Sequence, residues 1–274
     1  MLTVEKSKRV MVNKTGIINI ETADKKTVEE KILAMREGGK ILGNLLRDLK
    51  KYVQPGMTGK EVDAWVRNEI VKRGAGVAYD MLDDEFPGAI CISVNDELVH
   101  GAPTDEPFVD GDKVSFDLDI YYKGYFTDSA FTMIVGKKNN PAVKNMISVN
   151  ESAMWEGIEQ VKPGVHIGDV GNAVEKVLRK GHLGVIENYI GHGIGKTMHE
   201  LPEVPNYGKK GHGYKLVEGD TICIEPMSCL GRPANYVDKS SNWTVKMKDG
   251  SIGCHCEHTV LVTKDGYEVL TLSD

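Results

Sequence analysis

An internal repeat is the feature that most constrains this sequence. Val53-Gln54-Pro55-Gly56 returns as Val161-Lys162-Pro163-Gly164, and the apolar residues that follow each copy keep the same offset of 108: Val62, Val66 and Ile70 in the first, Val170, Val174 and Leu178 in the second. A repeat should be established before any fold is assigned. Chance similarity of two Pro-Gly turns is the alternative, but Gly111-Asp112 and Gly219-Asp220 continue the offset. We therefore expect two related halves, at about 27–140 and 141–274.

Each half is expected to contain two helices followed by strands. In the first half, Thr27 with Glu30 and Thr58 with Glu61 form capping-box patterns, and the two helical patterns end near Pro55-Gly56 and Gly74. Alternating apolar residues predict strands over 89–94, 113–120, 125–135, 221–225 and 253–262. Since no linker interrupts 27–274, we expect one α+β domain preceded by a short extension, 1–26.

Composition limits the function classes. The 274 residues carry a formal net charge of -6, and no apolar run approaches the ~20 residues needed to span a bilayer. Neither a membrane nor a nucleic-acid partner is therefore expected. Five cysteines are an odd number, and residues 1–26 contain no apolar core of a signal peptide. These features favour a reducing compartment and a cytoplasmic location.

Four carboxylates occur where strands should be apolar: Asp117, Asp128, Glu225 and Glu257. The repeat aligns Asp117 with Glu225 and draws two carboxylates from each half. Two carboxylates ~4 Å apart at an effective dielectric of ~20 repel by about 4 kcal/mol, so a convergent cluster requires cations. Taken singly, each fits a strand end; taken together, they predict a site for two divalent ions.

Three histidines could add neutral donors, because each lies in or near a glycine-containing segment. His192 lies within Gly191-His192-Gly193, His199 follows in Met198-His199-Glu200, and His100 precedes Gly101. A lone histidine is more often structural, but three of them beside an acidic pattern favour a role at the site.

The chain resembles the methionine aminopeptidases of the pita-bread fold, most closely the short bacterial type I enzymes, over about 27–272. The motifs that carry the resemblance are Val99-His100-Gly101, Asp117 with Asp128, Gly191 to Gly195, Met198-His199-Glu200, Ile224-Glu225-Pro226-Met227, Trp243 to Lys246 and Glu257-His258-Thr259. The short interval from Glu225 to Glu257 leaves no room for the helical insertion of type II enzymes, and no zinc-finger extension precedes Thr27.

The resemblance implies an antiparallel sheet covered by helices, with pseudo-two-fold symmetry and a dinuclear metal centre. It implies that Asp117 binds one ion, that Asp128 and Glu257 bridge both, and that His192 and Glu225 complete the second. Glu225 would also act as general base, while His100 and His199 would bind the substrate peptide. Two interpretations of Asp119 are equally favoured: a residue that orients a metal ligand, and a solvated strand carboxylate. The metal could be Co, Mn, Fe, Zn or Ni.

The implied reaction is hydrolytic removal of the initiator methionine from nascent polypeptides whose second residue is small. A monomer is also implied, while contact with the ribosome is left undecided. Cys91, Phe86, Met198 and Trp243 are expected to line the methionine pocket. Where the family has a cysteine, a tyrosine and a histidine before Cys91, this sequence has Asp80, Asp83, Asp84 and Glu85. That acidic stretch could bind the substrate ammonium, although a solvated loop is favoured.

Cys254-His255-Cys256-Glu257-His258 superficially resembles a zinc knuckle. On a strand, residues 254, 256 and 258 face one way and residues 255 and 257 the other, so one tetrahedral ion could not collect both cysteines and Glu257. Both cysteines are therefore interpreted as core residues.

Two other functions compete. An X-Pro aminopeptidase or prolidase shares the fold, although such enzymes usually have an additional N-terminal domain for which 26 leading residues are too few. A metal-free binding protein is opposed by the competent side chains at all five ligand positions. A metal assay would separate the binding protein from the enzymes, and Met-Ala-Ser against Ala-Pro substrates would separate the enzymes.

Overall fold

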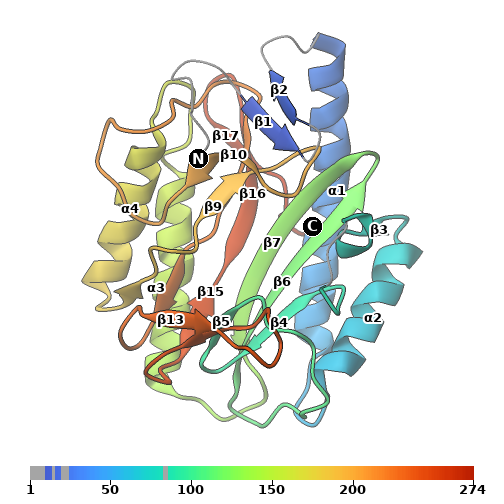
Figure 1. Ribbon diagram of the computed structural model, residues 1–274, viewed down its shortest axis with the longest axis vertical. Coiled ribbons are helices and arrows are strands. Elements are labelled where there is room, and N and C mark those ends of the chain that lie inside the picture. Colours follow the sequence, from blue (N-terminus) through green and yellow to red (C-terminus); the bar gives the residue numbers. More distant parts are fainter. Residues whose placement is uncertain (1–9, 14–15, 20–24, 83–85) are drawn as a thin grey trace.

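The computed structural model describes residues 10–13, 16–19, 25–82 and 86–274 (Figure 1). Its helices are α1 (Lys25–Tyr52), α2 (Gly59–Lys72), α3 (Pro141–Ile158) and α4 (Ile167–Lys180). The strands are β1 (Val10–Asn13), β2 (Gly16–Asn19), β3 (Gly76–Val77), β4 (Cys91–Val94), β5 (Glu97–Val99), β6 (Lys113–Tyr122), β7 (Tyr125–Ile134), β8 (Gly184–Val185), β9 (Gly191–Gly193), β10 (Glu200–Val204), β11 (Thr221–Ile224), β12 (Met227–Cys229), β13 (Asn235–Val237), β14 (Val245–Met247), β15 (Gly253–His255), β16 (Glu257–Val262) and β17 (Tyr267–Val269).

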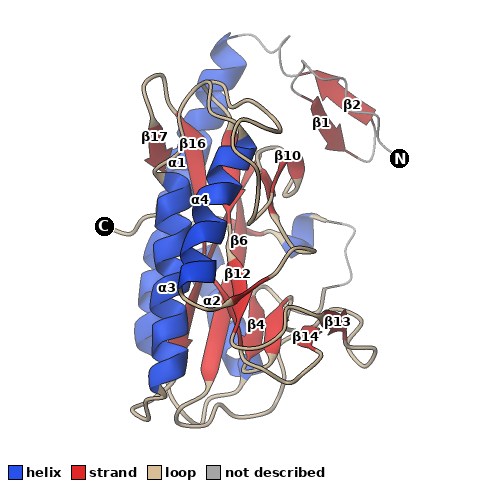
Figure 2. Ribbon diagram, turned by 90° about the vertical axis from the view of Figure 1, so that its left-hand side faces the viewer, coloured by secondary structure: helices blue, strands red, loops and turns tan. Residues whose placement is uncertain are grey.

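Among the described residues, the main sheet has nine strands in the order β10-β9-β11-β16-β7-β6-β3, with β17 on β16 and β4 on β6. Neighbouring strands along this order are antiparallel. Helices α1 to α4 lie together against one face of the sheet, as the side view shows (Figure 2). Within the described ranges, no helix is long and apolar enough to cross a membrane.

The offset of 108 residues recurs in the local structure. Helices α2 and α4, and the short strands β3 and β8, begin and end 108 residues apart. The same offset relates two isolated bridges, Thr58 with Pro107 and His166 with Lys215. Two helices and a strand segment therefore recur in each half, and the helix pairs lie next to each other across the width of the sheet, α3 and α4 on the left and α1 and α2 on the right of Figure 1.

Of the two helix starts predicted from capping-box patterns, one agrees with the structure and one does not. The Thr58–Glu61 capping box is present at the start of α2, as predicted. Helix α1, however, already includes Lys25, so the prediction that Thr27 is its N-cap was wrong. The extension also contains the antiparallel β1–β2 pair, which the pattern of residues 1–26 did not predict.

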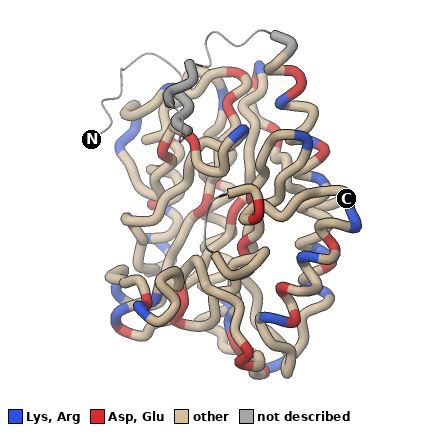
Figure 3. The backbone as a smooth tube through the Cα atoms, turned by 45° about the vertical axis from the view of Figure 1, so that its right-hand side comes forward, with Lys and Arg blue, Asp and Glu red and all other residues tan. Residues whose placement is uncertain are grey.

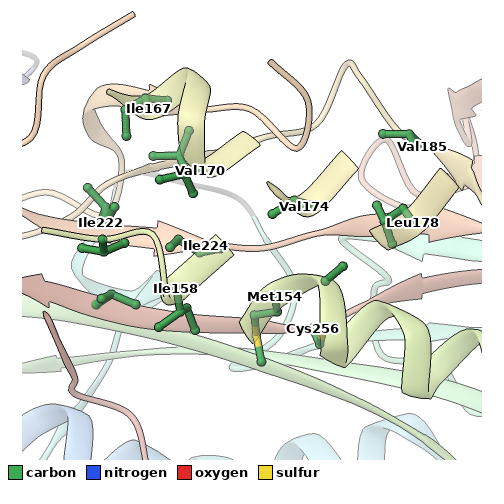
Figure 4. Close-up of a cluster of buried hydrophobic side chains, with 14 of the residues drawn as sticks. Met154, Ile158, Ile167, Val170, Val174, Leu178, Val185, Ile222, Ile224 and Cys256 are labelled. Carbon is green, nitrogen blue, oxygen red and sulfur yellow. The ribbon is translucent and has the colours of Figure 1, made fainter. Parts of the chain in front are cut away.

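Each half packs its helices over its own strands. In the second half, α3 and α4 contribute Ile158, Val170 and Leu178 to a buried cluster that also contains Ile222 and Ile224 of β11 (Figure 4). In the first half, α1 and α2 pack on the alternate residues Phe116, Leu118 and Ile120 of β6, all fully buried. Helix packing thus occupies one face of the sheet and leaves the other face for polar side chains.

Candidate metal centre and active site

The register of three neighbouring strands brings the acidic residues together. Asp117 on β6 and Glu257 on β16 both pair with Ala130 of the intervening β7, and Asp119 pairs with Asp128. Directly paired residues, and residues two apart on one strand, point to the same face of a sheet. All four carboxylates therefore lie on the face opposite the helices. Figure 3 shows several Asp and Glu positions, in red, close together near the centre of the molecule.

Glu225 and His192 complete the cluster from the second half. Glu225 follows β11 directly, whose last residue Ile224 pairs with His258, next to Glu257. His192 lies on β9 between two glycines, and a Cβ at Gly191 or Gly193 would collide with the carbonyl oxygen of Cys223 or Leu201. The glycines thus allow β9 to pack tightly and bring the imidazole to the carboxylates.

The ligand atoms lie close to one another. His192 Nε2 is 3.5 Å from Glu225 Oε1 and 3.9 Å from Asp128 Oδ2. His192 Nδ1 lies 2.9 Å from the carbonyl oxygen of Gly193, to which it can only donate. That hydrogen bond leaves the Nε2 lone pair directed at the carboxylates, the arrangement required of a metal ligand.

Burial opposes charge throughout this cluster. Desolvation raises the pKa of Asp117 and raises those of Asp119, Asp128, Glu225 and Glu257 well above their usual values. Burial also lowers the pKa of His192 to about 3, so the ring is a neutral donor at physiological pH. By itself the site would need protons to offset its charge; divalent cations achieve the same without protonation.

Unpartnered polar atoms show that the donor set fits such ions. Asp117 Oδ1, Asp128 Oδ1 and Glu257 Oε1 are buried and have no hydrogen-bond partner among the described residues. Buried polar atoms are normally satisfied, so these oxygens are available to a cation. Carboxylates with imidazole suit Mn, Fe, Co, Ni or Zn.

The two other predicted histidines flank the cluster. The His199 ring is perpendicular to that of His192, with centroids 4.4 Å apart, and the residue is exposed. His100 has a φ of 55°, a conformation that non-glycine residues rarely adopt and that is common at functional sites. Burial lowers the pKa of His100 to about 4, so its ring is neutral.

A cavity of about 290 Å³ is lined by the cluster and also by apolar side chains. Phe86 packs against Tyr79 and Trp243, with ring centroids 4.5 and 5.5 Å away, and Tyr79 Oη lies 3.2 Å from Cys91 Sγ. Met198 also lines the cavity and is buried. This wall of aromatic rings and sulfur atoms suits an unbranched thioether side chain.

The cavity brings together every site residue named from the sequence: Cys91, Phe86, His100, Asp117, Asp128, His192, Met198, His199, Glu225, Trp243 and Glu257. Asp119, considered as an orienting residue, also lines it. Several lining residues were not predicted, among them Tyr79 and His255. Tyr79 lies on a short 3₁₀ turn without periodicity, whereas the alternation that places His255 beside Glu257 could have indicated it.

The remaining sequence predictions have mixed outcomes. Cys254 and Cys256 are buried in the apolar cluster of the second half, which confirms them as core residues. Asp80 is half-exposed and forms an ion pair with Arg67, with 2.6 Å between Oδ2 and Nη1, consistent with a solvated carboxylate. Asp83, Asp84 and Glu85 lie outside the described residues.

Comparison with known proteins identifies the family. The model of metallopeptidase family M24 matches residues 33–264. The chain belongs to this family. It is 39% identical over 246 residues to a methionine aminopeptidase of Mycoplasma capricolum. The aligned region covers 90% of this chain and 97% of that relative.

Solved structures of the family support the same fold. The methionine aminopeptidase of Rickettsia prowazekii is 35% identical, with a TM-score of 0.86 and coverage of 89% of this chain and 98% of that one. The prolidase of Pyrococcus furiosus is 23% identical, with a TM-score of 0.69 and coverage of 90% and 65%, which shows the fold alone. The fold is therefore the pita-bread fold, as predicted. The carboxylates and the imidazole of the cluster suit the divalent metal ions of a metallopeptidase.

Metal removal should weaken the fold in a pH-dependent way. Burial raises the pKa values of these carboxyls in the folded protein above those in the unfolded chain. Without ions, the folded protein therefore loses stability as the pH rises from about 4, the unfolded pKa, through the raised folded values. Ions present at about 100 times Kd add about 2.7 kcal/mol, which corresponds to about 5–10 °C in Tm for a chain of this size. We expect chelation to lower Tm, and by more at pH 8 than at pH 5. A chelated protein whose Tm is unchanged at both pH values would contradict the charge argument. Scanning calorimetry at pH 5 and pH 8, with and without the chelator, measures these Tm values.

Proposed function

We propose that this chain is a methionine aminopeptidase, which hydrolyses the peptide bond after an N-terminal methionine when the second residue is small. The observation that carries the proposal is one cavity with two kinds of lining. The carboxylate and imidazole cluster lines it together with Cys91, Phe86, Met198 and Trp243, whose apolar and sulfur-containing surfaces can hold methionine. The curated relatives named methionine aminopeptidase support the same substrate.

We assign ligand roles by position. Asp117 would hold one ion, Asp128 and Glu257 would bridge two ions, and His192 and Glu225 would complete the second. The register supports this division, since Asp128 and Glu257 lie on the adjacent strands β7 and β16, at the centre of the group. Bound ions would polarise the scissile carbonyl and lower the pKa of the attacking water.

Glu225 would move the proton. Its carboxylate is buried and unusually basic, because burial raises its pKa. It can therefore accept a proton from the attacking water at one oxygen and return it to the departing amine. Because the residue is only 8% exposed, bulk water would not compete for that proton.

His100 and His199 would hold the substrate backbone. Both line the same cavity as the carboxylates, and Tyr189 packs edge-to-face on His100 at a centroid distance of 5.7 Å. Imidazole N–H groups in this cavity can donate to the peptide and to the oxyanion that forms on its carbonyl. His199, which is exposed, would contact the part of the peptide that leaves the cavity.

The cellular setting is part of the proposal. All five cysteines are free, which suits a reducing compartment, and we propose a cytoplasmic monomer acting on the N-termini of newly made polypeptides. Such substrates would bring the enzyme to the ribosome.

A substrate panel tests the proposal. We expect Met-Xaa-Ser peptides to be cleaved when Xaa is Ala, Ser, Gly, Thr, Val, Pro or Cys, and kcat/KM to fall by about 10²-fold or more for Lys, Leu or Phe. The expected reason is steric, because His100 and His199 line the cavity and would limit the volume beyond the scissile bond. An Ala-Pro peptide serves as the comparison substrate. Its preferred cleavage would assign the chain to the X-Pro hydrolases instead.

A further inference from the structure

His255 is the unexplained residue of the metal centre. It ends β15, two residues before Glu257, and its side chain is 3% exposed. Neither ring nitrogen has a hydrogen-bond partner in the part of the chain that the structure describes. A buried imidazole carries one donor and one acceptor that are costly to leave unsatisfied. The ring therefore needs a partner, and it faces the cluster.

The position of His255 mirrors that of His192 across one carboxylate. His192 Nε2 lies 3.5 Å from Glu225 Oε1, and His255 Nε2 lies 3.5 Å from Glu225 Oε2. His255 Nε2 is also 3.6 Å from Glu257 Oε2. The Glu225 carboxylate is thus held between two imidazoles, each beside a different carboxylate of the cluster.

The spacing matches that of donors to one ion. Donor atoms that bind a cation at about 2.1 Å in tetrahedral or octahedral geometry lie about 3.0–3.4 Å apart. Donor atoms of His255, Glu225 and Glu257 all lie within 4.8 Å of one another, and His255 Nε2 is 3.5 Å from Glu225 and 3.6 Å from Glu257. His255 Nδ1 is also 4.0 Å from Asp117 Oδ2. Small movements would therefore bring His255 onto the ion that Asp117 would hold, with Glu225 turning Oε2 toward that ion and Oε1 toward the ion of His192.

We propose that His255 is an additional metal ligand, so that each of the two ions binds one imidazole: His192 on one side of Glu225 and His255 on the other. The inference rests on the proposed function for the presence of two ions. It adds a nitrogen donor to the ion that would otherwise bind oxygen alone. A second imidazole shifts the centre toward Zn, Fe, Co or Ni and away from Mn and Mg.

Metal binding and X-ray absorption test this ligand without any assay of activity. In the zinc-loaded chain, outer-shell scattering should report about one imidazole per zinc, against about one half in His255→Gln. Competition titration with a chelator should show one of the two zinc sites weakened by about 10- to 100-fold in that variant.

His258→Gln is the matched control. His258 is three residues further along and on the opposite face of β16, where Nδ1 lies 2.8 Å from Thr271 Oγ1 and the ring packs on Trp155. Its replacement should leave the imidazole count and both zinc affinities unchanged. The count on the unaltered chain keeps the test valid even if a variant folds poorly.

Two results would overturn the ligand assignment. One is a scattering count of about one half imidazole per zinc in the unaltered chain. The other is a His255→Gln protein that binds two zinc ions with unchanged affinity. Either result would leave methionine release by the unaltered chain untouched, whereas failure of methionine release with the expected imidazole count would overturn the proposed function alone.

Discussion

Glu225→Gln is expected to lower kcat for methionine release by about 10³-fold or more, the largest effect of any single substitution considered for this site. The amide keeps the size of the side chain, but it can no longer accept the proton of the attacking water. It also removes a negative charge that would help to hold an ion. Steady-state kinetics on Met-Ala-Ser with metal in excess measures the loss.

His199→Ala provides the contrast. It should lower turnover by about 10²-fold, since a donor to the reacting peptide is lost, but it should retain the full metal content. Metal loss in His199→Ala would move that residue into the coordination shell. A Glu225→Gln protein that keeps more than about a tenth of the turnover would rule out the proton-transfer role.

Asp128→Asn is expected to remove most of the bound metal from both positions. A bridging carboxylate binds two ions, so its neutralisation weakens each, while loss of Asp117 should affect mainly one. The change is nearly isosteric and leaves the pairing of Asp128 with Asp119 in the register unaltered. Elemental analysis after dialysis, together with titration of the stripped protein, measures both sites.

Asp119→Asn is the matched control, because it makes the same change on the adjacent strand. It should retain both ions with affinity reduced by no more than about 10- to 100-fold, as for a residue that orients a ligand. Full metal content in Asp128→Asn, or equal losses in the two variants, would remove the bridging assignment.

The repeat allowed much of the fold to be predicted. An offset maintained by apolar residues fixes where α2 and α4 lie, because both must bury the same helical face against their own strands. Long alternating segments such as β6 and β7 were predicted within about two residues, since one face packs on helices and the other does not. Carboxylates on the polar face of those strands then marked the site.

Other features left no periodic signal. Strands β5, β12, β13 and β14 have three residues each, too few to establish alternation, and β9 begins and ends with glycine. Tyr79 reaches Cys91 from a 3₁₀ turn that no pattern marks. Strand alternation places His255 on the same side as Glu257, but only the three-dimensional register shows that Glu225 lies within 3.5 Å of it.

The most direct test of the central claim is kcat/KM over a series of Xaa-Ala-Ser peptides with the metal-loaded chain. Methionine should be the preferred Xaa, with some cleavage of norleucine, whose side chain only replaces the sulfur by a methylene. Leucine should be cleaved more slowly by about 10- to 200-fold, because apolar walls contribute only about 1–3 kcal/mol of discrimination for one missing methylene. Chelation should abolish the whole series. A preference for any other first residue would contradict the removal of initiator methionine, even with two ions bound.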